Sequence, residues 1–188
     1  MNNIQHKRNR LLSHLRNELI LRWLGTLGFM FIIADFLGCA TIKIEQGIFS
    51  PRDKNFIMKL PESEKGWEPL PADKEDIALW HKQYKAIIAV ISSDIENKGF
   101  SLEMLNRLLF LGITNKKIVL KESVLVDKQR ALHMILEGEL DHCRLKIDSY
   151  IIRTGDKVYD LVYWAPTDSF DKVKGDFENM IRSFKFTP

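Results

Sequence analysis

Residues 131–140 read Ala-Leu-His-Met-Ile-Leu-Glu-Gly-Glu-Leu, and their side chains fall into two alternating sets. The mostly apolar set is Leu132, Met134, Leu136, Gly138 and Leu140. The mixed set is Ala131, His133, Ile135, Glu137 and Glu139. Because successive side chains of a strand point to opposite faces, the pattern predicts a strand with the first set on a core and the second mostly toward water.

Two further strands follow this one after short turns. Residues 141–144 and 154–156 are turn segments, and each precedes a predicted strand, at 145–153 and at 158–164. Strands that are joined by tight turns pair antiparallel with their neighbours. The sequence therefore predicts an antiparallel meander of three strands.

More strands are expected on the N-terminal side of the meander. Residues 56–61, 77–81 and 116–126 have strand patterns, and residues 86–91 are six consecutive apolar residues that suit a strand covered on both faces. Residues 61–76 hold three prolines and many charges, so they are expected to form a long surface loop inside one domain.

Two helices are expected. Ser101 is a candidate N-cap for the first helix, which Gly112 and Asn115 would stop. Asp168 is the candidate cap of the second helix. An apolar stripe at spacings of three and four identifies this second helix, with Phe170, Val173, Phe177, Met180, Ile181 and Phe184. The stripe is expected to cover one face of the sheet, and residues 184–186 could add a last short strand.

The closing stretch resembles a known family. Tyr-Asp-Leu-Val-Tyr-Trp-Ala-Pro at 159–166, the amphipathic helix, and Ser-Phe-Lys-Phe at 183–186 are similar to PsbP-like domains. The resemblance implies an α/β (α+β) fold in which an antiparallel sheet is sandwiched by helices. It covers roughly residues 50–188 as an order of elements, and it implies a family used mostly for binding and assembly outside the cytoplasm. We expect residues 39–188 to form one globular domain. It carries over no active residue.

The N-terminus resembles a bacterial lipoprotein leader. Five basic residues precede residues 23–34, an uncharged and mostly apolar run, and Gly38-Cys39 forms a small-residue cleavage point. Gly38 and Cys39 match the lipobox, whereas Phe36 and Leu37 differ from its usual residues. The resemblance implies that residues 1–38 are an export signal, that Cys39 carries lipid, and that the rest of the chain lies outside the cytoplasm. Ala40 follows the cysteine, which in a Gram-negative cell suggests the outer membrane.

An uncleaved transmembrane anchor is the alternative for the N-terminus. Residues 23–42 are 20 residues long, which is enough to cross a bilayer. Asp35 would then lie near the midplane, where a carboxylate costs about 2.5–3.5 kcal/mol. The apolar residues of the span return a similar amount, so the span would be marginal.

Charge and cysteine content exclude some partners. The chain has 28 Lys+Arg and 25 Asp+Glu, and residues 1–38 hold five of the basic and two of the acidic residues. The remaining chain is therefore neutral by this count and is a poor nucleic-acid binder. Cys143 is the second of two cysteines; with Cys39 acylated it has no partner for a disulfide, and it is expected to be a small buried hydrophobe.

Candidate chemical groups are few. No phosphate loop, His-Glu-x-x-His, Cys-x-x-Cys or Gly-x-Ser-x-Gly motif is present. His133, Glu137 and Glu139 share a strand face and, with Asp141 and perhaps His142, could hold a cation such as calcium. The plainer interpretation is a solvated face paired with lysines such as Lys146 or Lys157 on a neighbouring strand.

Three other groups have plain structural interpretations. His142 and Cys143 would point apart in an extended segment, which argues against a nucleophile with its base. Trp80, His81 and Tyr84 could anchor a partner, although Trp80 is expected in the core. Lys116 and Lys117 are expected to be an ordinary exposed start to a strand.

The sequence thus predicts a lipid-anchored protein of the bacterial cell envelope that acts as a non-enzymatic binding or assembly module. Its expected contacts are the membrane, through lipid on Cys39, and another envelope protein; no cofactor or metal is expected. The alternatives are an exported metal-dependent hydrolase that uses His133, Glu137 and Glu139, or a protein held by an uncleaved transmembrane helix.

Overall fold

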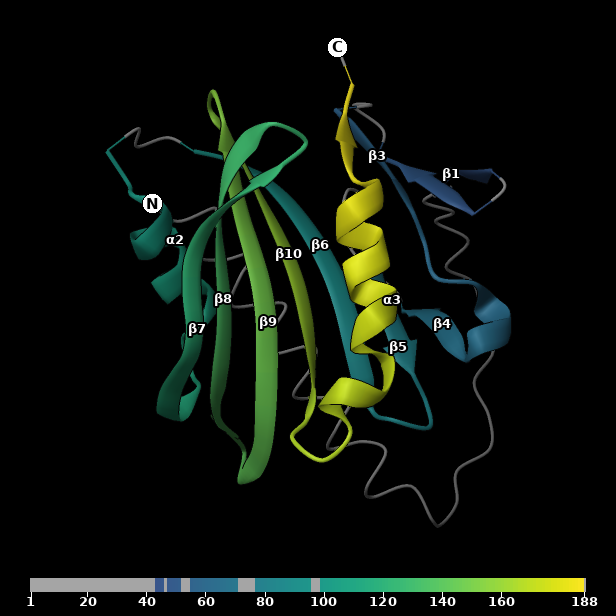
Figure 1. Ribbon diagram of the computed structural model, residues 1–188, viewed down its shortest axis with the longest axis vertical. Coiled ribbons are helices and arrows are strands. Elements are labelled where there is room, and N and C mark those ends of the chain that lie inside the picture. Colours follow the sequence, from purple (N-terminus) through teal and green to yellow (C-terminus); the bar gives the residue numbers. More distant parts are fainter. Residues whose placement is uncertain (1–42, 46, 52–54, 71–76, 96–98, 188) are drawn as a thin grey trace, which may run out of the picture.

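The computed structural model describes residues 43–45, 47–51, 55–70, 77–95 and 99–187. The described residues contain a seven-stranded antiparallel sheet with strand order β4-β5-β6-β10-β9-β8-β7 (Figure 1). Its strands are β4 (Trp67–Leu70), β5 (Ile77–His81), β6 (Ala86–Asp94), β7 (Thr114–Val126), β8 (Gln129–Leu140), β9 (Cys143–Thr154) and β10 (Lys157–Pro166).

The meander predicted from the sequence is confirmed. β8 pairs with β9, and β9 pairs with β10, both antiparallel. Asp141 and His142, in the turn between β8 and β9, have positive φ angles of 49° and 66°. The apolar run of β6 is buried on both faces, as expected, since Ala86, Ile88 and Val90 belong to one core cluster and Ile87 belongs to the other.

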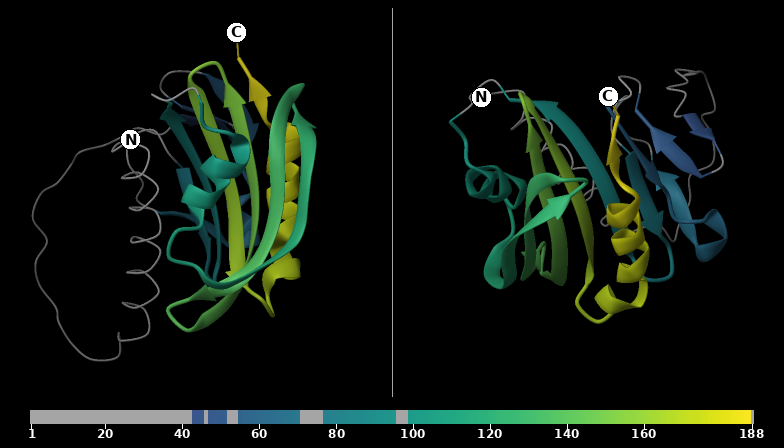
Figure 2. Two further views of the ribbon diagram at one scale, coloured as in Figure 1. Left: turned by 90° about the vertical axis from the view of Figure 1, so that its left-hand side faces the viewer. Right: turned by 45° about the horizontal axis from the view of Figure 1, so that its top comes forward.

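A helix packs on each face of the large sheet (Figure 2). α2 (Leu102–Leu109) contacts β8 and β9 on one face, and α3 (Phe170–Ser183) contacts β6 and β10 on the other. Two buried apolar clusters result, one for each face of the sheet. The predicted fold class, an antiparallel sheet sandwiched by helices in a single domain, is confirmed.

The ends of both helices follow from local chemistry. The Ser101 hydroxyl accepts the backbone N–H of Met104 at 3.2 Å and so caps α2 as predicted. Gly112, with φ of 92°, provides the turn after α2. α3 begins one residue later than predicted, because Ser169 is its N-cap in place of Asp168. The Ser169 hydroxyl donates to the backbone carbonyl of Tyr84 at 2.8 Å, which fixes the start of α3 against the β5–β6 turn.

A second, four-stranded sheet has the order β1-β2-β3-β11. Its strands are β1 (Lys43–Glu45), β2 (Ile48–Ser50), β3 (Phe56–Lys59) and β11 (Lys185–Phe186). The sequence predicted β3 and β11 but neither β1 nor β2. Phe184, at the end of α3, stacks on Phe56 with 5.0 Å between ring centroids, which joins this sheet to the helix.

Two details of the sequence prediction are wrong. Ala131, His133 and Ile135 of β8 are buried, although their face was expected to meet water mostly, because β8 contributes to the core cluster under α3. Residues 61–76 are not all loop: the described part forms a short 3-10 helix, η1 (Ser63–Lys65), and then strand β4. Trp67 is 2% exposed and anchors that segment, which composition alone did not indicate.

The described helices are short. None of them combines the length and the apolar character needed to cross a membrane. The predicted leader and Cys39 lie outside the described residues.

Candidate functional site

The histidine of the predicted acidic cluster lies in a partly buried charge network that crosses three strands. His133 of β8 is 7% exposed. Its Nδ1 lies 2.8 Å from Glu122 Oε1 of β7, and its Nε2 lies 2.9 Å from Asp148 Oδ1 of β9. A carboxylate only accepts hydrogen bonds, so both contacts are hydrogen bonds only when the imidazole is doubly protonated and donates from both nitrogens. The geometry therefore favours an imidazolium.

The surroundings of His133 support the charged form. The Tyr150 ring stacks on the His133 ring at 4.1 Å with an interplanar angle of 11°. From α3, Lys174 Nζ lies 3.7 Å from Asp148 Oδ2 and 3.0 Å from Glu178 Oε1. Burial on its own would lower the pKa of His133, but the hydrogen bonds to Asp148 and Glu122 outweigh it and raise the pKa above its ordinary value. The network binds α3 and three strands into one unit.

The other members of the predicted metal face do not join His133. Glu137 faces Lys117 of β7, with 3.7 Å between Oε2 and Nζ, and lies opposite Lys146 in the β8–β9 register. Glu139 accepts a hydrogen bond from Asn115 Nδ2 at 2.8 Å. Across the described ranges, no three His, Cys, Asp or Glu side chains are placed to hold a metal ion. His133, Glu137 and Glu139 are thus used in separate cross-strand pairs, close to the plainer interpretation.

The remaining sequence candidates divide between surface and core. Cys143 is exposed at the start of β9, so the expectation of a buried residue is wrong. The neighbouring turn, with His142 in the left-handed region, carries the side chain out to solvent. His81 is 3% exposed and packs between the Trp67 and Tyr84 rings, at 5.1 and 4.8 Å. Trp80 lies in the α2-side core as expected.

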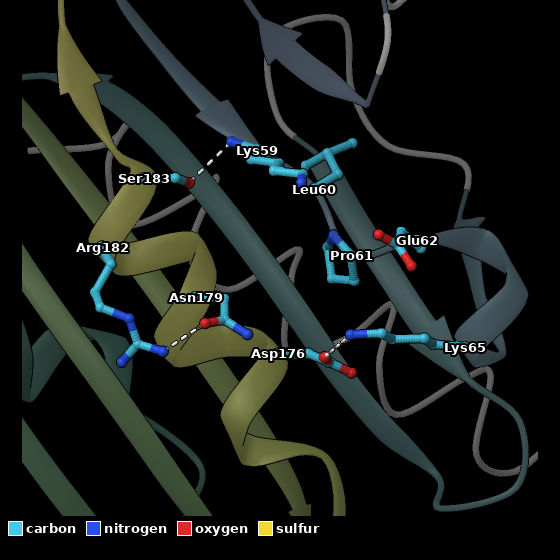
Figure 3. A pocket seen from close by; sticks show the side chains of 9 residues that line it. All are labelled: Lys59, Leu60, Pro61, Glu62, Lys65, Asp176, Asn179, Arg182 and Ser183. Carbon is cyan, nitrogen blue, oxygen red and sulfur yellow. Dashed lines mark hydrogen bonds and ion pairs between the residues drawn. The ribbon is translucent and has the colours of Figure 1, made fainter.

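A polar groove of about 450 Å³ runs between α3 and the segment that leads into β4 (Figure 3). Lys65 reaches across it to Asp176 of α3, with 3.1 Å between Nζ and Oδ1. Trp67 Nε1 donates to the other oxygen, Oδ2, at 3.0 Å. Both oxygens of Asp176 are therefore engaged by this segment, and the groove marks the joint where η1 and β4 are fastened to α3.

The outer edge of β7 is the candidate interaction surface. Among the described strands, β7 pairs with β8 alone, and it forms one end of the large sheet (Figure 1). We define the β7 edge as the exposed stretch Lys116, Lys117, Ile118, Val119 and Lys121. Ile118 is 57% exposed and Val119 is 47% exposed. Val119 has no pairing partner in β8, because the register shifts between Ile118 and Leu120.

Most of the exposed large apolar side chains belong to β7 and to the helix and turn that precede it. Of the six large apolar residues that are exposed in the described chain, five belong to α2, the turn after it, or β7. They are Met104, Leu111, Ile118, Val119 and Leu125. Lys121 and Glu103 join α2 to β7 through an ion pair of 3.8 Å. Apolar groups exposed together are a mark of interaction surfaces.

Sequence reasoning missed several of these groups. Glu122 and Asp148 are 11 and 15 residues away from His133 along the chain, so only the strand register brings them together. Asp148 carries one readable signal, because it is a carboxylate in the middle of a predicted strand, between Ile147 and the apolar pair Ile151-Ile152. The sequence gives no comparable signal that Ile118 and Val119 are exposed, because the apolar residues of a strand are expected to be buried against other parts of the protein.

Comparison with known proteins identifies the fold. No family model matches the sequence, and no curated protein matches it. The solution structure of cyanobacterial PsbP from Synechocystis superposes with a TM-score of 0.54 at 15% identity, covering 87% of this chain and 99% of that one. The fold is PsbP-like. Two further structures share it.

One of them is LpqN of Mycobacterium tuberculosis, which is involved in cell envelope biogenesis. It matches with a TM-score of 0.56 at 9% identity, covering 71% of this chain and 83% of that one. The other is a protein from Bacteroides thetaiotaomicron, with a TM-score of 0.52 at 10% identity; the match covers 76% of this chain and 48% of that one, so this chain spans about half its length. At these identities the likeness extends to the fold alone.

Proposed function

We propose that this chain is a lipoprotein of the bacterial cell envelope, and that its PsbP-like domain is a non-enzymatic module for binding or assembly. The observation that carries the proposal is that five of the six exposed large apolar side chains of the described residues belong to α2, the turn after it and β7. The acidic and histidine side chains that suggested catalysis are engaged with partners on neighbouring strands instead. The domain therefore offers a surface for contact with a partner.

The location of the domain rests on the leader. The lipobox residues Gly38 and Cys39 and the basic residues before the apolar run support export and acylation of Cys39. The likeness to LpqN, a protein involved in cell envelope biogenesis, agrees with this location. In a Gram-negative cell, Ala40 after the cysteine favours the outer membrane with the domain facing the periplasm.

A lipid on Cys39 would hold the domain close to the membrane. β1 begins at Lys43, four residues later, and four extended residues span at most about 14 Å. β1 and β7 lie at opposite sides of the molecule (Figure 1). The tether would thus hold the small sheet near the lipid headgroups and leave the β7 edge turned away from the tether.

The experiment that tests this proposal is metabolic labelling with a fatty acid, carried out on the full chain in a bacterial host. We expect the wild-type chain to be labelled and Cys39→Ser to be unlabelled. The matched control is Cys143→Ser, which removes the exposed second thiol and keeps Cys39. Labelling that persists in Cys39→Ser, or is absent from the wild type while the chain keeps residues 1–38 and stays in the membrane, would favour the uncleaved anchor instead.

A further inference from the structure

We propose that the β7 edge takes up an extended peptide segment of another envelope protein as an eighth strand of the large sheet, and that this segment carries acidic and apolar residues on both of its faces. This inference rests on the proposed function and adds the class of partner. An edge strand presents unpaired backbone N–H and C=O groups, and an incoming strand can bond to them while its side chains provide specificity.

The shape of the edge suits an added strand. β7 is 13 residues long, which is well above the ordinary strand length of about 5–6 residues. Ile118 lies opposite Leu136 and Val119 is the extra residue at the register shift that follows, and both are about half exposed. An incoming strand with apolar side chains would cover part of both side chains. Burial of this apolar surface would favour association.

The edge is also held rigid by contacts from within the sheet. Glu122 is bonded to His133, and the Thr114 hydroxyl donates to the backbone carbonyl of Glu139 at 3.3 Å. Asn115 donates to the Glu139 side chain. These contacts fix β7 to β8 on both sides of Ile118 and Val119. A rigid edge loses little conformational entropy when it binds a partner.

The charge of the edge points to an acidic partner. Lys116, Lys117 and Lys121 lie within six residues of one another, and the nearest carboxylate of the same strand, Glu122, is engaged by His133. Lys117 and Lys121 have loose surface pairs, at 3.7 Å to Glu137 and 3.8 Å to Glu103. Pairs of this kind contribute little, so an incoming carboxylate can replace them.

The same lysines disfavour a second copy of this chain as the occupant. Pairing of β7 with the β7 edge of a second copy would bring Lys116, Lys117 and Lys121 of one copy close to the same three lysines of the other. Like charges directly opposite each other destabilise a strand pair, and lysine on an edge is a usual protection against self-association. The edge therefore rejects its own copy and accepts a strand of opposite charge.

The test uses the full-length chain in neutral detergent and two labelled synthetic peptides of about eight residues, a usual strand length. One peptide repeats Glu-Glu-Val-Val, which puts Glu on both faces of an extended strand, and the other repeats Lys-Lys-Val-Val. Binding is followed by fluorescence anisotropy. We expect the acidic peptide to bind, to bind more weakly as salt screens the lysines, and to protect the amides of β7 from hydrogen exchange. The basic peptide should not bind.

Two variants locate the site. Lys117→Glu/Lys121→Glu should weaken binding of the acidic peptide roughly tenfold or more and create binding of the basic one. Val119→Pro should block the edge. Val119 has no pairing partner in β8, and thermal melting checks that this variant still folds. The charge-matched control is Lys82→Glu/Lys172→Glu, which changes two exposed lysines outside β7 and should leave binding unchanged.

Three outcomes would overturn the inference. The first is that the wild type does not bind the acidic peptide. The second is that the Lys82→Glu/Lys172→Glu control loses as much peptide binding as Lys117→Glu/Lys121→Glu. The third is that the wild type forms a dimer that Val119→Pro dissociates. The last would make a second copy the occupant. None of these outcomes depends on Cys39, so fatty-acid labelling can succeed when the peptide test fails, and the two proposals are tested separately.

Discussion

His133 shows how one residue can couple the sheet to pH. Its imidazole donates to Glu122 and Asp148 at once, which requires both ring nitrogens to be protonated. Loss of one proton removes a hydrogen bond to one carboxylate and the positive charge that lies next to both. Because Asp148 is 1% exposed, water cannot easily replace that bond.

The pKa of His133 gives the sign of the pH effect. The folded pKa lies above the ordinary value of 6.5, so the folded state holds the proton more tightly than the unfolded chain. This stabilisation is fully present below pH 6.5 and is lost as the pH rises through the folded pKa. We expect the free energy of unfolding, measured by denaturant titration on both sides of pH 6.5, to fall as the pH increases.

The control for this prediction is His133→Gln, which keeps a polar side chain in place but does not titrate in this range. The variant should be less stable at low pH, and its stability should be nearly flat across the same interval. A variant with the same downward slope as the wild type would assign the effect to another group.

At the scale of elements, two glycines provide a matched pair. A Cβ on Gly138 of β8 would meet the Ile113 side chain and the Thr114 backbone carbonyl, both in the segment that enters β7. A Cβ on Gly175, inside α3, would meet nothing within 4 Å. We expect Gly138→Ala to lower the free energy of unfolding by about 1–3 kcal/mol and Gly175→Ala to raise it by about 0.5–1 kcal/mol.

Thermal or denaturant unfolding of the two variants beside the wild type measures both effects. If Gly138→Ala were neutral, β7 would not approach β8 as closely as described, and the rigid edge inferred above would lose its support. Alanine at Gly175 that destabilises the protein would contradict an exposed helical position there.

The elements that the sequence predicts well have a repeating signal of their own. The period-2 pattern of β8 and the apolar stripe of α3 each determine a structure without knowledge of a partner. Predictions failed where a distant partner decides the outcome. The face of Ala131 and Ile135 is buried by packing contacts from elsewhere in the chain. Strand β4 is held in place because Trp67 packs on His81 and donates a hydrogen bond to Asp176.

The candidate site was less predictable than the fold for the same reason. The sequence draws attention to His133, but its partners are Glu122 of β7 and Asp148 of β9, and the strand register decides which residues these are. Cys143 was expected inside because cysteine is often buried, yet the turn at His142 places it outside. Lys116 and Lys117 were interpreted as an ordinary strand start, since the sequence does not show that β7 ends the sheet.

At the scale of the whole molecule, the two ends of the fold have different proposed tasks. The small sheet follows directly after the proposed lipid site, and the β7 edge lies at the far side of the large sheet (Figure 1). The partly buried charge network and the two cores make one rigid body between them. A short tether on a rigid body holds a partner at a fixed distance from the membrane, which suits assembly.

The most direct measurement is the intact mass of the native chain after extraction from the membrane. Our proposal predicts a species that lacks residues 1–38, begins at Cys39 and carries the added mass of acyl chains on that residue. A chain of unmodified mass with Met1 still in place would contradict it.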